Sequence, residues 1–165
     1  MIRRALLTGL VIVVLAAGGL ALTGQRTFQV EIVIPVPPEA VWAVLTDTPA
    51  YGEWNPVFVA VEGRLEEGAQ TRNSVRDPSG ALLQITSDVV RVVPNREINQ
   101  FGGTIGLITF DHTWRLEPVP EGTRVIQHEI DRGIGMWFWD SDWIEPAYRR
   151  VNEALRERVK VKQAS

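Results

Sequence analysis

The two histidines of the chain, His112 and His128, are the side chains best suited to proton transfer near neutral pH. They lie on either side of a turn at residues 118–122, in segments that alternate polar and apolar residues as β-strands do. If this hairpin is symmetric about Pro120, the two imidazoles lie opposite each other on one face. They would then orient a carbonyl or hydroxyl group of a ligand, or act as acid and base. Alternatively, they hydrogen-bond to each other and serve only to satisfy buried polar groups in the core. A one-residue shift of register would turn one of them to the other face.

The face that the histidines are expected to share is otherwise apolar. It carries Phe110, Trp114 and Leu116 on the first strand and Ile126 and Ile130 on the second. We therefore expect a polar pair in an apolar cavity, an arrangement common in small-molecule sites. Asp111 and Glu129 alternate onto the opposite face, so no third ligand joins the histidines and we expect no metal.

Tryptophans form a second group of candidate site residues, with six in the chain. Trp137, Trp139 and Trp143 flank the start of the terminal helix, where they could pack the core, contact a ligand or meet a membrane surface. Trp54 could line an entrance, although packing of its own helical turn explains it equally well. The predicted ligand site comprises His112, His128, Phe110, Trp114, Ile126, Ile130, Trp54 and Trp139.

The glycines at 102, 103 and 106 form no phosphate-binding loop, because the lysine and the hydroxyl of that motif are absent. We expect no cofactor there. We interpret residues 102–106 instead as a flexible loop that gates the cavity.

Period-2 patterns and turn residues place the elements that must position these side chains. Strands are predicted over residues 27–34, 57–61, 70–76, 81–93, 97–101, 107–117 and 123–131. A short helix is predicted from Pro37–Pro38, since proline suits the first turn of a helix. A long terminal helix is predicted to start near Pro146, with one apolar face formed by Ile144, Tyr148, Val151, Leu155 and Val159.

Three stretches carry a family resemblance. The run PVPPEAVWAVLTDTPAYGEWNP at 35–56 resembles the opening of START-like (SRPBCC) proteins, in particular their polyketide cyclase/dehydrase-like group. The hairpin from His112 to His128 and the helix around residues 152–155 resemble later parts of the same family. The resemblance implies an α+β helix-grip fold, in which a curved antiparallel sheet wraps around a long C-terminal helix.

Members that resemble one another in this way include lipid carriers, cyclases, quinone-binding proteins and co-chaperones, so three functions stay open. The first is binding, with or without transport, of an apolar molecule such as a lipid, quinone or polyketide-like compound. The second is a cyclase or dehydratase that uses His112 and His128 as acid and base, although no third catalytic group is evident and we lean against an enzyme. The third is a ligand-free module that binds another envelope protein.

The N-terminus is expected to be a separate segment, residues 1–26, before a START-like domain at 27–165. Residues 5–23 carry no charged side chain, and as a helix they would span about 28 Å, close to the ~30 Å core of a bilayer. Arg3 and Arg4 precede this segment, which predicts an anchor with the domain on the non-cytoplasmic side. Alternatively, Gly19-Leu20-Ala21 is a signal-peptidase site and the domain is secreted or periplasmic.

Charge and cysteine content exclude several classes of protein. Of 17 basic residues three precede residue 27, whereas all 20 acidic residues follow it, so the domain itself is acidic. An acidic domain argues against a nucleic-acid partner, which requires clustered lysine and arginine. The chain has no cysteine, which removes disulfides, thiol nucleophiles and cysteine metal sites.

Overall fold

A seven-stranded antiparallel sheet in the order β1-β7-β6-β5-β4-β3-β2 forms most of the domain. The computed structural model describes residues 2–164, with residues 2, 3, 5, 17 and 21 described by their backbone alone. The strands are β1 Gln25–Ile34, β2 Phe58–Glu62, β3 Gln70–Arg76, β4 Leu82–Val93, β5 Glu97–Thr104, β6 Ile108–Val119 and β7 Gly122–Arg132. All seven predicted strands are confirmed, with bounds that move by three residues or fewer at each end.

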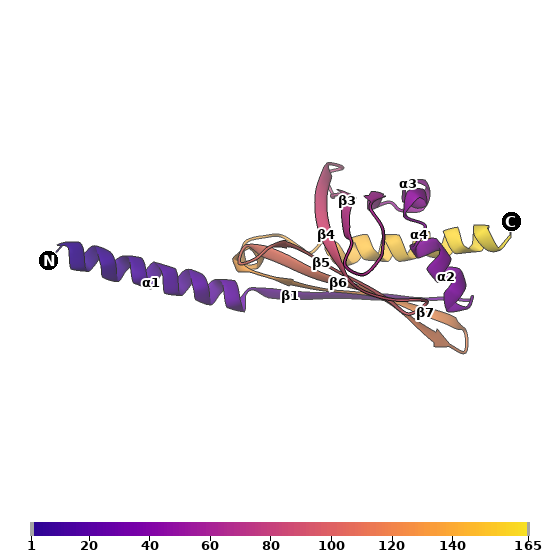
Figure 1. Cartoon of the computed structure of the whole chain (residues 1–165), viewed down its shortest axis with the longest axis horizontal. Helices are drawn as coiled ribbons and strands as arrows, with labels where there is room; N and C mark the ends of the chain where they lie inside the picture. The colour runs from indigo at the N-terminus through magenta and orange to yellow at the C-terminus, as the bar shows by residue number, and fades with distance from the viewer. Residues whose placement is uncertain (1, 165) are drawn as a thin grey trace.

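The long helix α4, Ile144–Gln163, lies along one face of the curved sheet (Figure 1). Its buried residues include Tyr148, Val151, Leu155 and Val159, which confirms the predicted apolar face. The helix begins at Ile144, two residues before Pro146, near which its start was predicted. Pro146 is tolerated because the N–H groups of a first helical turn have no partner within the helix.

Short helical elements close one end of the fold, between β1 and β2. They are α2 Pro38–Leu45, the 3-10 turn η1 Thr48–Ala50 and α3 Tyr51–Trp54. The predicted proline start of the first of these helices is confirmed. Tyr51 donates from its hydroxyl to the carbonyl oxygen of Leu45 at 2.7 Å, and the side-chain oxygen of Asn55 accepts from the N–H of Phe58 at 2.8 Å. These bonds set the direction in which the chain enters β2.

The core lies between the sheet, α4 and α2. It contains Ile34, Val41, Leu45, Val125 and Leu155, all of them inaccessible to solvent. The arrangement is the α+β helix grip that the family resemblance implied. Gly102 and Gly103, predicted to belong to a loop, continue β5 instead, and the turn into β6 is formed by Ile105, Gly106 and Leu107.

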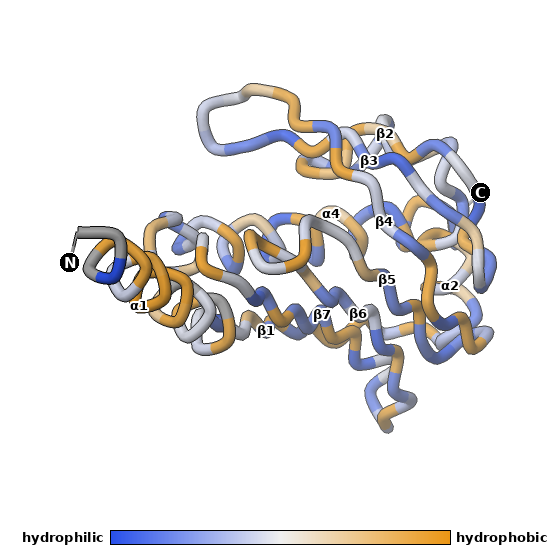
Figure 2. Tube along the Cα trace, turned by 60° about the vertical axis from the view of Figure 1, so that its left-hand side comes forward, coloured by the Kyte–Doolittle hydropathy of each residue, from blue (hydrophilic) through white to orange (hydrophobic). Residues whose placement is uncertain are grey.

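The helix α1, Ile2–Thr23, projects away from the sheet at the start of β1 (Figure 1). Most of α1 has the orange colour of apolar residues in Figure 2. Many of its described side chains are exposed, among them Leu10 and Leu15. Among the described residues, no helix combines the length and apolar character that crossing a bilayer requires. Residues 5, 17 and 21 of the predicted span lie outside the described side chains.

Candidate functional site

The hairpin of β6 and β7 has a register that differs by one residue from a hairpin centred on Pro120. Val119 pairs with Gly122, so the turn consists of Pro120 and Glu121 and its centre falls between them. As a result His112 lies opposite Glu129, and His128 lies opposite Thr113. The predicted pair of neighbouring histidines on one face is therefore wrong.

The shift turns the other predicted residues of β7 away from α4, because successive side chains of a strand point to opposite faces. His128, Ile126 and Ile130 alternate onto the outer face of the sheet, away from the cavity. Val125, Gln127 and Glu129 face inward in their place, and each is buried. The prediction that Glu129 points outward is wrong for the same reason.

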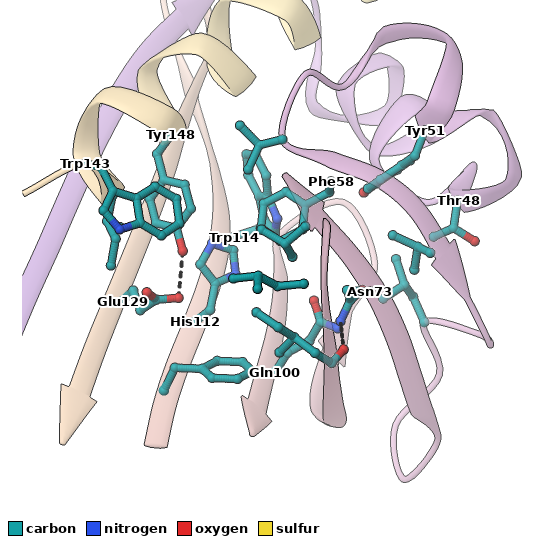
Figure 3. A pocket seen from close by; sticks show the side chains of 18 of the residues that line it. Thr48, Tyr51, Phe58, Asn73, Gln100, His112, Trp114, Glu129, Trp143 and Tyr148 are labelled. Carbon is teal, nitrogen blue, oxygen red and sulfur yellow. Dashed lines mark hydrogen bonds between the residues drawn. The ribbon is translucent and has the colours of Figure 1, made fainter. Parts of the chain in front are cut away.

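A cavity of about 140 Å³ lies between the inner face of the sheet and α4 (Figure 3). Apolar and aromatic side chains form most of its wall, including Phe58, Val75, Leu83, Ile85, Phe110, Trp114, Trp139, Trp143 and Ile144. Phe110, Trp114, Trp139 and His112 were predicted for the site, and all four line this cavity. The described lining does not include Trp54, which is half-buried and packs edge-on against Tyr51 with ring centroids 5.1 Å apart.

Gly102 makes room for one of these aromatic walls. It pairs with Phe110 across β5 and β6, and a Cβ atom at Gly102 would lie 2.5 Å from the tip of the Phe110 ring. Any side chain at this position would therefore push the ring out of place. The absence of a Cβ lets the tip of the Phe110 ring approach the backbone of Gly102, and Phe110 forms that part of the cavity wall.

A cluster of buried titratable groups forms one end of the cavity. The Tyr148 hydroxyl on α4 donates to Glu129 Oε2 on β7 at 2.6 Å. Burial, together with the nearby carboxyl of Asp131, raises the pKa of Glu129 well above its usual range. Burial likewise raises the pKa of Asp131, whose side chain is hydrogen-bonded to Glu129. The pair therefore tends to hold a proton at neutral pH, since two adjacent carboxylates are not both ionised in a low dielectric.

His112 is held next to this cluster as a neutral ring. Burial lowers its pKa to about 4. The ring packs edge-on against Tyr148, with centroids 5.3 Å apart, and its Nε2 lies 3.4 Å from Gln127 Oε1. Gln127 in turn donates to the carbonyl oxygen of Tyr148 at 3.2 Å and to Asn152 Oδ1 at 2.7 Å. This network fixes the orientation of the imidazole.

A second polar group lies farther along the sheet, on β3, β4 and β5. The hydroxyls of Thr71 and Ser87 are 2.9 Å apart. The side-chain amide of Asn73 donates to Ser87 Oγ at 3.0 Å, and that of Gln100 donates to Thr71 Oγ1 at 2.9 Å. Asn73 and Gln100 also line the cavity.

Among the described residues no three His, Asp or Glu side chains converge as a metal site requires.

The reading of the sequence missed Glu129, Tyr148, Asn73 and Gln100. Tyr148 was assigned only to the apolar face of the terminal helix, and Glu129 was placed on the wrong face. Asn73 and Gln100 occupy inward positions of strands whose side chains alternate between the two faces of the sheet. A polar residue at a position where the pattern expects an apolar one was the signal that could have identified them as site residues.

Comparisons with known proteins agree with this architecture. Residues 25–160 match the family model described as polyketide cyclase/dehydrase and lipid transport. A protein from Nitrosomonas europaea superimposes with a TM-score of 0.68 at 16% identity, over 84% of this chain and 97% of that one. An uncharacterised protein from Rhizobium leguminosarum gives 0.67 at 18% identity, over 83% and 95%.

A third similar structure is the di-domain ARO/CYC protein BexL from the BE-7585A biosynthetic pathway. It has a TM-score of 0.64 at 16% identity, and the match covers 84% of this chain and 50% of that one. At these identities the structures indicate a shared fold alone. No curated protein matches the sequence.

Proposed function

This chain belongs to the polyketide cyclase/dehydrase and lipid-transport family, and we propose that it binds a small, largely apolar molecule in the cavity between the sheet and α4. The main support for this proposal is the cavity itself, which has a volume of about 140 Å³ and is lined mainly by aromatic and aliphatic side chains. Burial of apolar ligand surface contributes about 25 cal/mol per Å². The polar groups of the wall would orient the ligand.

An enzyme of the cyclase or dehydratase type is a second candidate. It is supported by the buried carboxyl of Glu129, which tends to keep its proton and lies against the Tyr148 hydroxyl in the cavity wall. Such a group can donate a proton to a developing oxyanion. The role would fall to Glu129, Tyr148 and His112, since His128 faces away. It is the weaker candidate, because His112 with a pKa of about 4 is a poor base at neutral pH.

The proposed location of the protein rests on its sequence. We propose that residues 5–23 hold the domain at a membrane, with the domain on the non-cytoplasmic side, or are removed as a signal peptide. The absence of charge from this segment and the exposed apolar side chains of α1 support it. Extraction of membranes with alkaline carbonate separates the outcomes, since an anchored chain stays in the pellet and a cleaved one is soluble and shorter.

Uptake of two neutral aromatic probes tests the binding function. 2-Naphthol and 2-methoxynaphthalene are titrated against the full chain in mild detergent, and binding is followed by their fluorescence. Ile85→Trp should weaken uptake of both at least tenfold, because Ile85 lines the cavity and a larger ring would fill it.

The matched control is Leu82→Trp, on the same strand at an exposed position, which should bind as the wild type does. If the wild type takes up neither probe, or if Ile85→Trp binds both unchanged, the proposal is wrong.

A further inference from the structure

A row of polar side chains crosses the inner face of the sheet through the otherwise apolar cavity. Glu129 on β7 pairs with His112 on β6, and His112 pairs with Gln100 on β5. Gln100 then reaches Ser87 on β4, and Asn73 follows on β3. Figure 3 shows Glu129, His112, Gln100 and Asn73 one after another along the cavity floor. We call His112, Gln100 and Asn73 the acceptor row, because each of them presents a hydrogen-bond acceptor to the cavity.

Asn73 presents its carbonyl oxygen to the cavity. Its NH₂ group donates to Ser87 Oγ at 3.0 Å and to the backbone carbonyl oxygen of Ile85 at 3.3 Å. Because a backbone carbonyl can only accept, the amide cannot be flipped without two oxygens facing each other. Asn73 Oδ1 is therefore turned away from the sheet, and it has no hydrogen-bond partner among the described residues.

Gln100 repeats this arrangement on β5. Its NH₂ group donates to Thr71 Oγ1 at 2.9 Å and to Ser87 Oγ at 3.0 Å. The two hydroxyls are themselves hydrogen-bonded to each other, so one of their two protons is already used. Both hydroxyls accept from the Gln100 amide, and Gln100 Oε1, which has no hydrogen-bond partner among the described residues, is left facing the cavity.

His112 adds a third acceptor through its tautomer. Gln127 donates both to the carbonyl oxygen of Tyr148 and to Asn152 Oδ1, so its Oε1 is the atom that faces the imidazole. A neutral His112 must then carry its proton on Nε2 to bond to Gln127. This leaves Nδ1 as a bare acceptor, and no described residue donates to it.

Cations are missing from the described wall of the cavity, whose remaining donors are neutral hydroxyl and indole N–H groups. The Tyr148 hydroxyl is turned to Glu129, and Glu129 is hydrogen-bonded to Asp131. The described lining of the cavity contains no lysine or arginine, while the buried Glu129 lines it and the buried Asp131 lies next to Glu129. An anionic headgroup would thus meet acceptors and acidic groups with no counter-charge, which is costly in a low dielectric.

From this arrangement we infer that the acceptor row selects neutral, apolar molecules that carry hydroxyl or amino donors along one edge, and that it rejects carboxylate and phosphate ligands. The inference rests on the proposed binding function and specifies its ligand. An ether or hydrocarbon of the same shape would leave the three acceptors unpaired, and unmade bonds of this kind cost more than a made bond gains. A fatty acid or phospholipid is excluded as the ligand.

Three probes of one shape test this selectivity on the wild-type full chain: 2-naphthol, 2-methoxynaphthalene and 2-naphthoate at pH 7.5. We expect 2-naphthol to bind about tenfold more tightly than the methyl ether, and the anionic naphthoate to bind more weakly than either. Equal affinity for 2-naphthol and its ether, or preferred binding of naphthoate, would overturn the inference while leaving the binding function intact. Failure of all three to bind overturns the proposed function, and the inference with it.

Two variants then assign the preference to the row. Asn73→Leu and Gln100→Met each remove an acceptor while keeping the approximate size of the side chain. In both variants the ratio of the affinity for 2-naphthol to that for 2-methoxynaphthalene should fall several-fold. Both should still bind 2-methoxynaphthalene, whereas a misfolded variant would not. Gln84→Met is the control, since Gln84 is exposed on β4 and bonds to Ser74. A preference unchanged in both cavity variants would contradict the assignment, and the comparison of three probes does not depend on either variant folding.

Discussion

Replacement of Glu129 by glutamine should remove a pH-dependent loss of stability. Glu129 is buried on β7, accepts from Tyr148 at 2.6 Å, and is hydrogen-bonded to Asp131. Burial raises the pKa of this carboxyl. Glutamine has the same shape, and its oxygen can still accept from Tyr148 while its NH₂ group donates to Asp131. The variant therefore mimics the protonated carboxyl without its ability to ionise.

The magnitude follows from linkage between protonation and folding. In the unfolded chain Glu129 loses its proton near its ordinary pKa of 4.5, whereas in the folded chain it keeps the proton to higher pH. Between these values the folded state binds more protons, so the free energy of unfolding falls as the pH rises, by at most 1.36 kcal/mol per pH unit. From pH 5 to pH 7 the wild type should lose about 2 kcal/mol relative to Glu129→Gln.

Urea unfolding followed by circular dichroism, at half-unit steps from pH 5 to pH 7, measures this difference directly. Glu121→Gln is the control, since it removes an exposed carboxyl at the turn of the same hairpin. It should give a pH dependence parallel to that of the wild type. If the difference between Glu129→Gln and the wild type stays constant with pH, Glu129 is ionised in the folded protein and the account of the buried cluster is wrong.

Three other substitutions test the cavity and the core. Burial lowers the pKa of His112 to about 4, so the wild type should lose stability as the pH falls from 6.5 toward 4; His112→Asn should abolish this part of the acid sensitivity in thermal melts at each pH. Gly102→Val should displace the Phe110 ring, weaken uptake of 2-methoxynaphthalene several-fold and cost about 1–3 kcal/mol, as titration and urea unfolding would measure. Leu155→Ala should cost about 2–5 kcal/mol, because Leu155 is fully buried, whereas Leu82→Ala at an exposed position should change unfolding by less than about 0.5 kcal/mol.

The strands were predictable because their signals are local. Residues 70–76 and 82–93 alternate or cluster apolar residues and are bounded by glycine, proline and aspartate, and the structure places strands there. The same holds for α4, whose buried face at Tyr148, Val151 and Leu155 follows the 3.6-residue period. The family motif adds the order in which these elements pack, which periodicity alone does not specify.

The composition of the cavity was only partly predictable from the same information. Phe110, Trp114 and His112 alternate along one strand and therefore share one of its faces. One prediction of which face points inward places all three inside, and they do line the cavity. His128 and Glu129 lie across a turn, and their faces depend on whether its centre falls on Pro120 or after it. A turn of two residues places the centre half a residue later, which exchanges the two side chains.

The elements, the family and the apolar character of the interior could therefore be inferred from the amino-acid sequence alone, because these depend on patterns within a few residues. The folded arrangement was needed to show that Glu129, and not His128, lies beside His112, and that Asn73 and Gln100 continue the polar row. These choices depend on strand register and on hydrogen bonds between residues far apart in the chain. A one-residue change in pairing inverts every side chain of a strand, and no local pattern at β7 distinguishes the two registers.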